Sequence, residues 1–206
     1  MKKFRTDYRL IWIPLICFVG ITYGLLIGKL GIYWDDWAYT WTRLELGFHG
    51  LLRHFSFSRP VAGQIHNLAI LATDGSPLKI QIWGLIFQVL GSFCVGQLVR
   101  STWKDSDFAA ALCALLFLAY PGFSMQPIAI NFAFSYFLIG ILCISFIFSM
   151  KANRDPRHHL LLTIAAMALA ALNLFASEYF FLLELLRPLS SGVKTPKMRT
   201  AASKNG

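Results

Sequence analysis

Two adjacent carboxylates stand directly after the first long apolar stretch, in the sequence Tyr33-Trp34-Asp35-Asp36-Trp37. Holding two acids among aromatic side chains at a membrane surface is costly unless they have a partner or a task. A carboxylate there can act as a general base toward a hydroxyl at the lipid–water boundary. It can instead help to bind a divalent cation, which favours oxygen ligands. The structural alternative is an aspartate that caps the following helix, with the tryptophans in the interfacial belt.

Two further groups of polar residues could carry chemistry. In the first, Ser58-Arg59-Pro60 is followed by His66 and Asn67. The planar, permanently charged guanidinium of Arg59 suits a phosphate group. The structural alternative is an arginine that extends its charge to water along an apolar surface, with a histidine satisfied by nearby backbone.

The second group is Ser177-Glu178-Tyr179, an acid embedded in an apolar stretch. An isolated charge in lipid is expensive, so Glu178 is a functional candidate, and its structural alternative is a hydrogen bond to another helix. The four cysteines all lie inside apolar segments without CxxC spacing. Their placement indicates neither a zinc site nor a disulfide framework.

Long apolar stretches must position these residues, and they predict an all-α integral membrane protein. Hydrophobic residues make up 56% of the 206 residues and charged residues only 14%, whereas soluble domains carry about a quarter charged residues. A helix needs about 20 apolar residues to cross the hydrocarbon core. We therefore predict about five to six transmembrane helices in a module over residues 1–189, with spans near residues 10–30, 80–99, 108–120, 128–150 and 160–186.

Positive charge predicts the orientation. Four basic residues precede the first span, which places the N-terminus in the cytoplasm and the loop at residues 31–79 on the outer face. The net charge of +9 is explained by such basic turns, so we expect no nucleic-acid partner. The Pro- and Gly-containing segment 121–127 predicts a hairpin between the third and fourth spans.

The end of the chain allows two topologies. If residues 160–186 cross once, the basic tail emerges outside, against the charge rule. We favour a helical pair, with residues 160–176 running outward and residues 179–186 running inward from a bend at Ser177 and Glu178. The polar tail at residues 190–206 is predicted to be disordered.

The outer loop is expected to hold two helices along the membrane. Tryptophan, leucine and phenylalanine recur at spacings of three and four from Trp37 onward, which predicts an amphipathic interfacial helix interrupted near Gly47 and Gly50. A second helix would run to about residue 72, with Pro60 in its first turn and Ser58 or Arg59 near its cap. The turn at residues 73–77 would end it.

These features together resemble bacterial membrane glycosyltransferases of the C-type fold, whose donors are polyprenyl-phosphate sugars. In that family an acidic motif follows the first span, and amphipathic helices lie along the membrane in the first outer loop. Asp35 and Asp36 match this acidic motif in type and place. Four further parts of this sequence resemble features that recur in the family: the Arg59-Pro60 pair, the His66-Asn67 pair, residues 116–122 and Glu178. The resemblance covers roughly residues 10–188.

The resemblance implies an inverting transferase in the bacterial inner (plasma) membrane, acting at its outer face. Asp35 or Asp36 would take the proton of the acceptor hydroxyl as it attacks the anomeric carbon. Arg59 and His66 would bind the donor phosphate. Glu178 would orient Arg59 or the acceptor. The supporting residues implied are Glu178 and Tyr179.

The partners so implied are a polyprenyl-phosphate-linked sugar, membrane lipid and other membrane subunits. Family members usually run to twice this length or more, so we expect the chain to be an N-terminal part, from a truncated or frameshifted gene. One rival function is a non-catalytic membrane subunit or polyprenyl-lipid-binding protein that tolerates loss of both aspartates. A small transporter coupled through Glu178 fits less well, because the polar residues gather at one membrane face rather than at the midplane.

Overall fold

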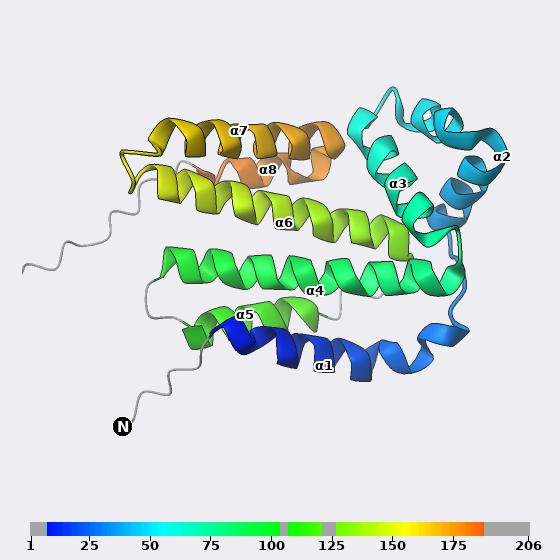
Figure 1. Ribbon diagram of the computed structural model, residues 1–206, viewed down its shortest axis with the longest axis horizontal. Coiled ribbons are helices and arrows are strands. Elements are labelled where there is room, and N and C mark those ends of the chain that lie inside the picture. Colours follow the sequence, from blue (N-terminus) through cyan, green and yellow to red (C-terminus); the bar gives the residue numbers. More distant parts are fainter. Residues whose placement is uncertain (1–7, 104–106, 121–126, 188–206) are drawn as a thin grey trace, which may run out of the picture.

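The computed structural model describes residues 8–103, 107–120 and 127–187, and these ranges hold helices and turns without any strand. The α-helices in chain order are α1 (Trp12–Thr22), α2 (Asp35–Phe55), α3 (Pro60–Thr73), α4 (Pro77–Thr102), α5 (Asp107–Leu118), α6 (Ala129–Ala152), α7 (His159–Ala176) and α8 (Phe181–Glu184). Short 3-10 helices are η1 (Tyr8–Ile11), η2 (Gly24–Lys29) and η4 (Glu178–Phe180). Figure 1 shows α1, α4, α5, α6 and α7 side by side along the long axis, with α2 and α3 gathered at one end.

Three of the described helices, α4, α6 and α7, are long and apolar enough to cross a membrane. Helices α1 and α5 are apolar but shorter. The expected first span over residues 10–30 is not one continuous α-helix, since α1 ends at Thr22 and the chain continues as η2. The all-helical architecture of the described residues therefore agrees with the sequence prediction, and three of their helices are candidate membrane spans. The predicted count of five to six spans is not confirmed.

Helices α4 and α6 form the centre of the bundle because glycines on α4 allow close backbone approach. A Cβ atom placed on Gly84 would lie 2.9 Å from the Cβ of Ala129, and one on Gly91 would lie 3.1 Å from the carbonyl oxygen of Tyr136. Small residues at such contacts are typical of helix packing in membranes, where dispersion contacts replace the hydrophobic effect. Gln81 on α4 connects this helix to the segments before α2 and α6, because it donates hydrogen bonds to the carbonyl oxygens of Gly31 and Pro127, at 2.9 and 2.8 Å.

Replacing Gly84 by leucine is expected to lower the free energy of unfolding by about 3 kcal/mol, because overpacking forces the two helix backbones apart. Gly20 on α1 provides the control, since a Cβ placed there meets nothing within 4 Å. Thermal unfolding of both variants in detergent micelles measures the difference. Equal melting temperatures for Gly84→Leu and Gly20→Leu would contradict this close α4–α6 packing.

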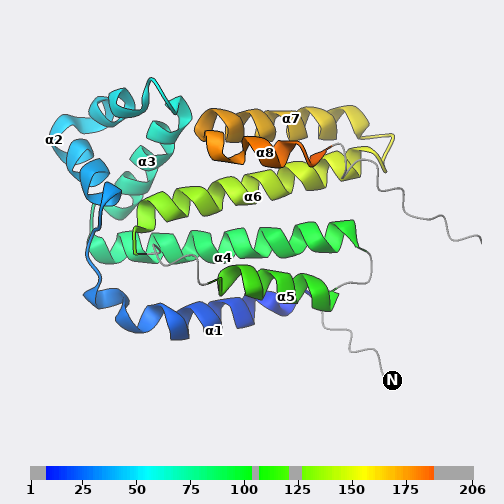
Figure 2. The ribbon, with the colours of Figure 1, turned by 180° about the vertical axis from the view of Figure 1, so that it is seen from behind.

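The chain reverses direction after α7, as the favoured topology required. Ser177 is extended, with φ −160° and ψ 131°, and breaks the helix after Ala176. Helix α8 then lies beside α6 and α7 in both views (Figures 1 and 2). Arg187 reaches back along α6, where its Nη1 donates to the Ser149 hydroxyl at 2.6 Å and its Nη2 to the Ser145 hydroxyl at 2.9 Å. The predicted bend at Ser177 is therefore present, but the segment after it is formed by η4 and the four-residue α8 rather than by one helix over residues 179–186.

The two helices of the first long loop also follow the predicted pattern. Helix α2 is kinked at Gly47, whose φ of 68° is readily adopted only by glycine. Pro60 occupies the first turn of α3, where its missing N–H costs nothing. Asp74 and Gly75 both have positive φ and make the turn into α4. Most of the hairpin predicted at residues 121–127 and the whole tail at residues 190–206 lie outside the described residues.

Candidate functional site

The two aspartates of the acidic pair have different environments. Asp36 is fully buried, and its carboxylate accepts hydrogen bonds from the backbone N–H groups of Ile130, at 2.7 Å, and Asn131, at 3.0 Å. These N–H groups belong to the first turn of α6, where the helix has no internal partners for them. Asp36 therefore caps α6, a helix distant in sequence, rather than the following helix α2 that the structural alternative named.

Burial determines the acidity of Asp36. Removing the carboxyl group from water raises its pKa to about 7, and the negative charge of Asp35 adds to this rise. The hydrogen bonds from the α6 backbone act in the opposite direction. Because Asp36 is enclosed and both of its oxygens are occupied, an acceptor hydroxyl cannot reach it in this arrangement.

Asp35, in contrast, is exposed at the start of α2. Consecutive helical residues project about 100° apart, so the inward direction of Asp36 leaves Asp35 on the surface. The preceding Trp34 has φ 46° and ψ −124°, a strained conformation for a bulky residue. Such strain gathers at functional sites, where the surrounding structure compensates for it. Of the two predicted bases, only Asp35 is accessible to a substrate.

Arg59 and Glu178 form a two-pronged ion pair. The Nε of Arg59 donates to one carboxylate oxygen of Glu178 at 3.0 Å, and its Nη2 donates to the other at 2.5 Å. The Tyr179 ring covers the guanidinium face, with its centroid 4.7 Å from Cζ. The hydrogen bonds from Arg59 lower the pKa of Glu178 and keep it ionised. The expectation that Glu178 orients Arg59 agrees with this contact, which joins α3 to η4.

The Arg59–Glu178 pair leaves one part of the guanidinium open. The side chain of Arg59 is 24% exposed. Its Nε and Nη2 donate to Glu178, and its side chain also hydrogen-bonds that of Tyr179. A guanidinium can hold a carboxylate on one edge and a phosphate oxygen on another. Glu178 and Tyr179 thus fix the position of a guanidinium that is still partly exposed.

His66 lies deeper than the sequence suggested. It is buried, with its ring packed between those of Tyr39, Phe55 and Phe134 at centroid distances of 4.8–5.0 Å. Its Nδ1 lies 2.7 Å from the carbonyl oxygen of Ala62. A carbonyl only accepts, so Nδ1 carries the proton and Nε2 is a free acceptor. Burial lowers the pKa of His66 to about 4, so the ring is neutral at pH 7 and does not act as a second phosphate-binding cation.

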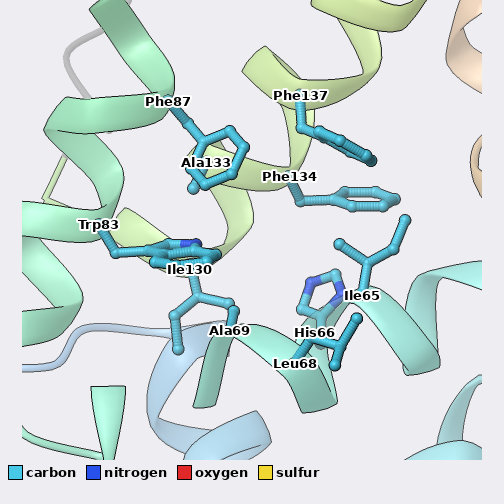
Figure 3. A pocket seen from close by; sticks show the side chains of 10 residues that line it. All are labelled: Ile65, His66, Leu68, Ala69, Trp83, Phe87, Ile130, Ala133, Phe134 and Phe137. Carbon is cyan, nitrogen blue, oxygen red and sulfur yellow. The ribbon is translucent and has the colours of Figure 1, made fainter. Parts of the chain in front are cut away.

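An apolar cavity of about 200 Å³ opens beside His66, between α3, α4 and α6. Figure 3 shows the α4 side chains Trp83 and Phe87 facing the α6 side chains Phe134 and Phe137 across it, with His66 at its lower edge. The other lining residues are Ile65, Leu68, Ala69, Ile130 and Ala133. Ligand sites are commonly lined by apolar and aromatic side chains with a few polar groups. The apolar lining of this cavity suits a hydrocarbon chain.

Tyr39 lies at the centre of this region but did not stand out in the sequence. Its ring centroid is 4.9 Å from that of His66 and 5.1 Å from that of Phe55. Burial raises its pKa to about 12; the charge of Asp35 adds to the rise and that of Arg59 opposes it. Its position four residues after Asp35, on the same helix face, was the signal that could have identified it.

Within the described ranges, no group of three or more His, Cys, Asp or Glu side chains is placed to hold a metal ion. The acidic pair itself does not form a chelate, because Asp36 turns inward and Asp35 outward. No known protein family, curated protein or solved structure matches the chain. A functional assignment therefore depends on the site's own chemistry.

Proposed function

We propose that the chain is a membrane glycosyltransferase, or the N-terminal part of one, that moves a sugar from a polyprenyl-phosphate donor to an acceptor hydroxyl. The observation that supports this proposal best is the partly exposed guanidinium of Arg59, which Glu178 and Tyr179 hold in place. Helix α3, which follows Arg59, packs against α2, and α2 begins with the exposed carboxylate of Asp35. The same helix α3 carries His66, which lines the apolar cavity. The carboxylate can take the proton of the acceptor, the guanidinium can bind the phosphate of the donor, and the cavity can hold its lipid chain.

The chemistry would be a single displacement. Asp35 takes the proton of the acceptor hydroxyl, and the acceptor oxygen attacks the anomeric carbon on the side opposite the phosphate. The bond between the anomeric carbon and the phosphate oxygen breaks, its electron pair leaves with the polyprenyl phosphate, and the carbon is inverted. Arg59 neutralises the charge that develops on this leaving group, an electrostatic role that requires a preorganised donor. The contacts of Glu178 and Tyr179 provide that preorganisation.

The membrane arrangement in this proposal has five crossings. Helices α4, α6 and α7 cross fully. The other two crossings are α5 and the segment made of α1 and η2, and α8 returns only part of the way. A cytoplasmic N-terminus then places α2 and α3 at the outer interface, where the exposed Trp37 and Trp41 of α2 suit the headgroup region. The apolar cavity would receive the first part of the polyprenyl chain, with its phosphate toward Arg59.

A second candidate is a non-catalytic subunit that binds polyprenyl lipids. The burial of Asp36 favours it, because half of the acidic motif then has a structural task. Such a protein would need Arg59 and the apolar cavity but not the carboxylate of Asp35. In this case an Asp35→Asn variant would bind the polyprenyl lipid as the wild type does, and neither protein would transfer a sugar.

The proposal is tested first by donor binding. Replacing Arg59 by glutamine should weaken the binding of a fluorescent polyprenyl phosphate at least about 10-fold, because a hydrogen bond to a charged group contributes about 1.5–3 kcal/mol. Lys79→Gln is the matched control, since Lys79 is an exposed cation at the same end of the molecule, paired with Asp74. Equal affinities of the two variants, or a wild-type protein that does not bind the lipid, would argue against a donor site here.

A further inference from the structure

A second cavity lies near the opposite end of the bundle and has no part in the proposed transfer. It has a volume of about 530 Å³ and opens between α6, α7 and α8. The part of α6 that lines it begins 20 residues after Ala129, which places it about 30 Å from the Asp36 cap. Its polar lining residues are Ser149, Asn153, His159, Thr163, Glu184 and Arg187.

Arg187 fixes a positive group in the wall of this cavity. Its Nε donates to Glu184 at 2.7 Å, and hydrogen bonds to the Ser145 and Ser149 hydroxyls hold the two Nη atoms. The Phe146 ring lies 4.8 Å from Cζ. The guanidinium is therefore held rigidly, while 24% of the side chain is still exposed. Glu184 balances its charge, so any net attraction for an anion must come from the mouth of the cavity.

The loop that adjoins this cavity is strongly cationic. The loop from Lys151 to His159 carries three permanent cations, Lys151, Arg154 and Arg157, against one carboxylate, Asp155. Arg154 donates to the carbonyl oxygen of Ser101 at 3.3 Å, at the end of α4. Asp155 is engaged by His158 at 2.8 Å, and its pKa is lowered mainly by that hydrogen bond. All three cations are exposed. Ala152, Asn153 and His159, which line the cavity, are part of this same loop region.

An apolar surface continues from the cavity along α7. Met167 lines the cavity and is 67% exposed, and Leu160, Leu161 and Ile164 are exposed beside it. α7 is a candidate membrane span with few residues buried inside the protein, so this surface suits hydrocarbon chains. A ligand that matches the whole arrangement has an anionic polar group at the mouth and alkyl chains along α7.

We propose that this cavity binds the phosphate headgroup of an anionic phospholipid, with the acyl chains lying along α7. Basic pockets between transmembrane helices on the cytoplasmic side of a membrane are suited to such headgroups. Lys151 and Arg157 attract the phosphate, and the Asn153 amide, which lines the cavity, provides a donor. The site is independent of the transfer chemistry at the other end of the bundle.

Native mass spectrometry of the purified full chain tests this site by comparing retained phosphatidylglycerol and phosphatidylcholine with identical acyl chains. We expect preferential retention of phosphatidylglycerol. The double variant Lys151→Gln/Arg157→Gln should bind it about 25-fold more weakly, since each cation near an anionic lipid contributes about 5-fold. The control, Arg53→Gln/Lys79→Gln, removes two exposed cations from the other end and should bind like the wild type. Equal retention of both lipids, or equal losses in both double variants, would overturn the proposal.

Two further arms separate the cavity from general surface attraction and the lipid from free phosphate. Thr163→Trp places a large ring in the cavity without changing charge, and it should abolish selective retention while the melting temperature stays near that of the wild type. If this filled variant still retains phosphatidylglycerol, the lipid does not bind in the cavity. Soluble glycerol phosphate at millimolar concentration should not displace the lipid. Efficient displacement would show a site for free phosphate compounds rather than for a lipid.

Discussion

Replacing Asp35 by asparagine is expected to lower the rate of sugar transfer by about 10²–10⁴-fold, the usual contribution of a general base. The amide keeps the size and shape of the side chain but cannot take a proton from the acceptor hydroxyl. Because Asp35 is exposed, the change should leave the melting temperature of the protein unchanged. The measurement is transfer from a polyprenyl-phosphate sugar by the purified protein in micelles, together with its thermal unfolding curve.

Asp35→Glu is the companion variant, because it retains a carboxylate on a longer side chain. Partial activity of Asp35→Glu beside an inactive Asp35→Asn would support a proton-transfer role. Full transfer activity in Asp35→Asn would exclude Asp35 as the base and favour the lipid-binding alternative. Donor binding should be nearly unchanged in both variants, since the phosphate contacts are assigned to Arg59.

Asp36→Ala, one position further along the chain, is expected to affect stability instead. The substitution removes both acceptors for the backbone N–H groups of Ile130 and Asn131. Each buried donor left without a partner costs about 1–3 kcal/mol, so the loss of partners for two donors should lower the free energy of unfolding by about 2–6 kcal/mol. Chemical unfolding in mixed micelles measures this loss, with Asp35→Ala as the matched control at an exposed position.

If Asp36→Ala does not fold, Asp36→Asn provides the graded test. Asparagine keeps one acceptor oxygen and turns an amide group toward the other N–H, so its stability should fall between those of the alanine variant and the wild type. A normal unfolding curve for Asp36→Ala combined with complete loss of transfer would reverse the two assignments. Asp36 would then be the base and Asp35 a surface residue.

Local features of this protein could be predicted well from its residues. The bilayer requires long uncharged stretches for any crossing helix, so α4, α6 and α7 were visible as apolar runs. Pro60 and Gly47 act through their own backbone conformations, so the start of α3 and the kink in α2 needed no tertiary information. The bend at Ser177 followed from charge, because a single crossing would have moved the basic tail to the wrong side.

The ends of the predicted spans could be predicted less well from the sequence. Apolar composition indicates where a chain can enter lipid, but the end of a helix depends on which groups receive its last hydrogen bonds. The expected span at residues 10–30 is interrupted after Thr22, and α4 runs well past the expected residues 80–99, from Pro77 to Thr102. Pro77 in the first turn of α4 was a signal for its start, whereas no proline or charged residue marks the end of α1 at Thr22.

The site was determined by contacts between residues far apart in the chain. Sequence alone identified Asp35 and Asp36 as a pair but could not distinguish them, because adjacent identical residues have the same composition and nearly the same neighbours. Only the packing of α2 against α6 directs Asp36 to N–H groups that lie 94 and 95 positions away and leaves Asp35 in the open. The same holds for Arg59, whose partner Glu178 lies 119 positions further along.

By itself, then, the sequence determined a helical fold with helices apolar enough to span a membrane, the two helices of the loop at residues 31–79 and the residue types available for chemistry. Periodicity, hydrophobicity and turn residues act over a few positions, so a single chain shows their effect directly. The tertiary structure alone decided that Asp36 is a cap, that His66 is a neutral residue in an apolar wall and that Arg59 is held by Glu178 and Tyr179. Burial and long-range hydrogen bonds set these roles, and both depend on how the helices pack.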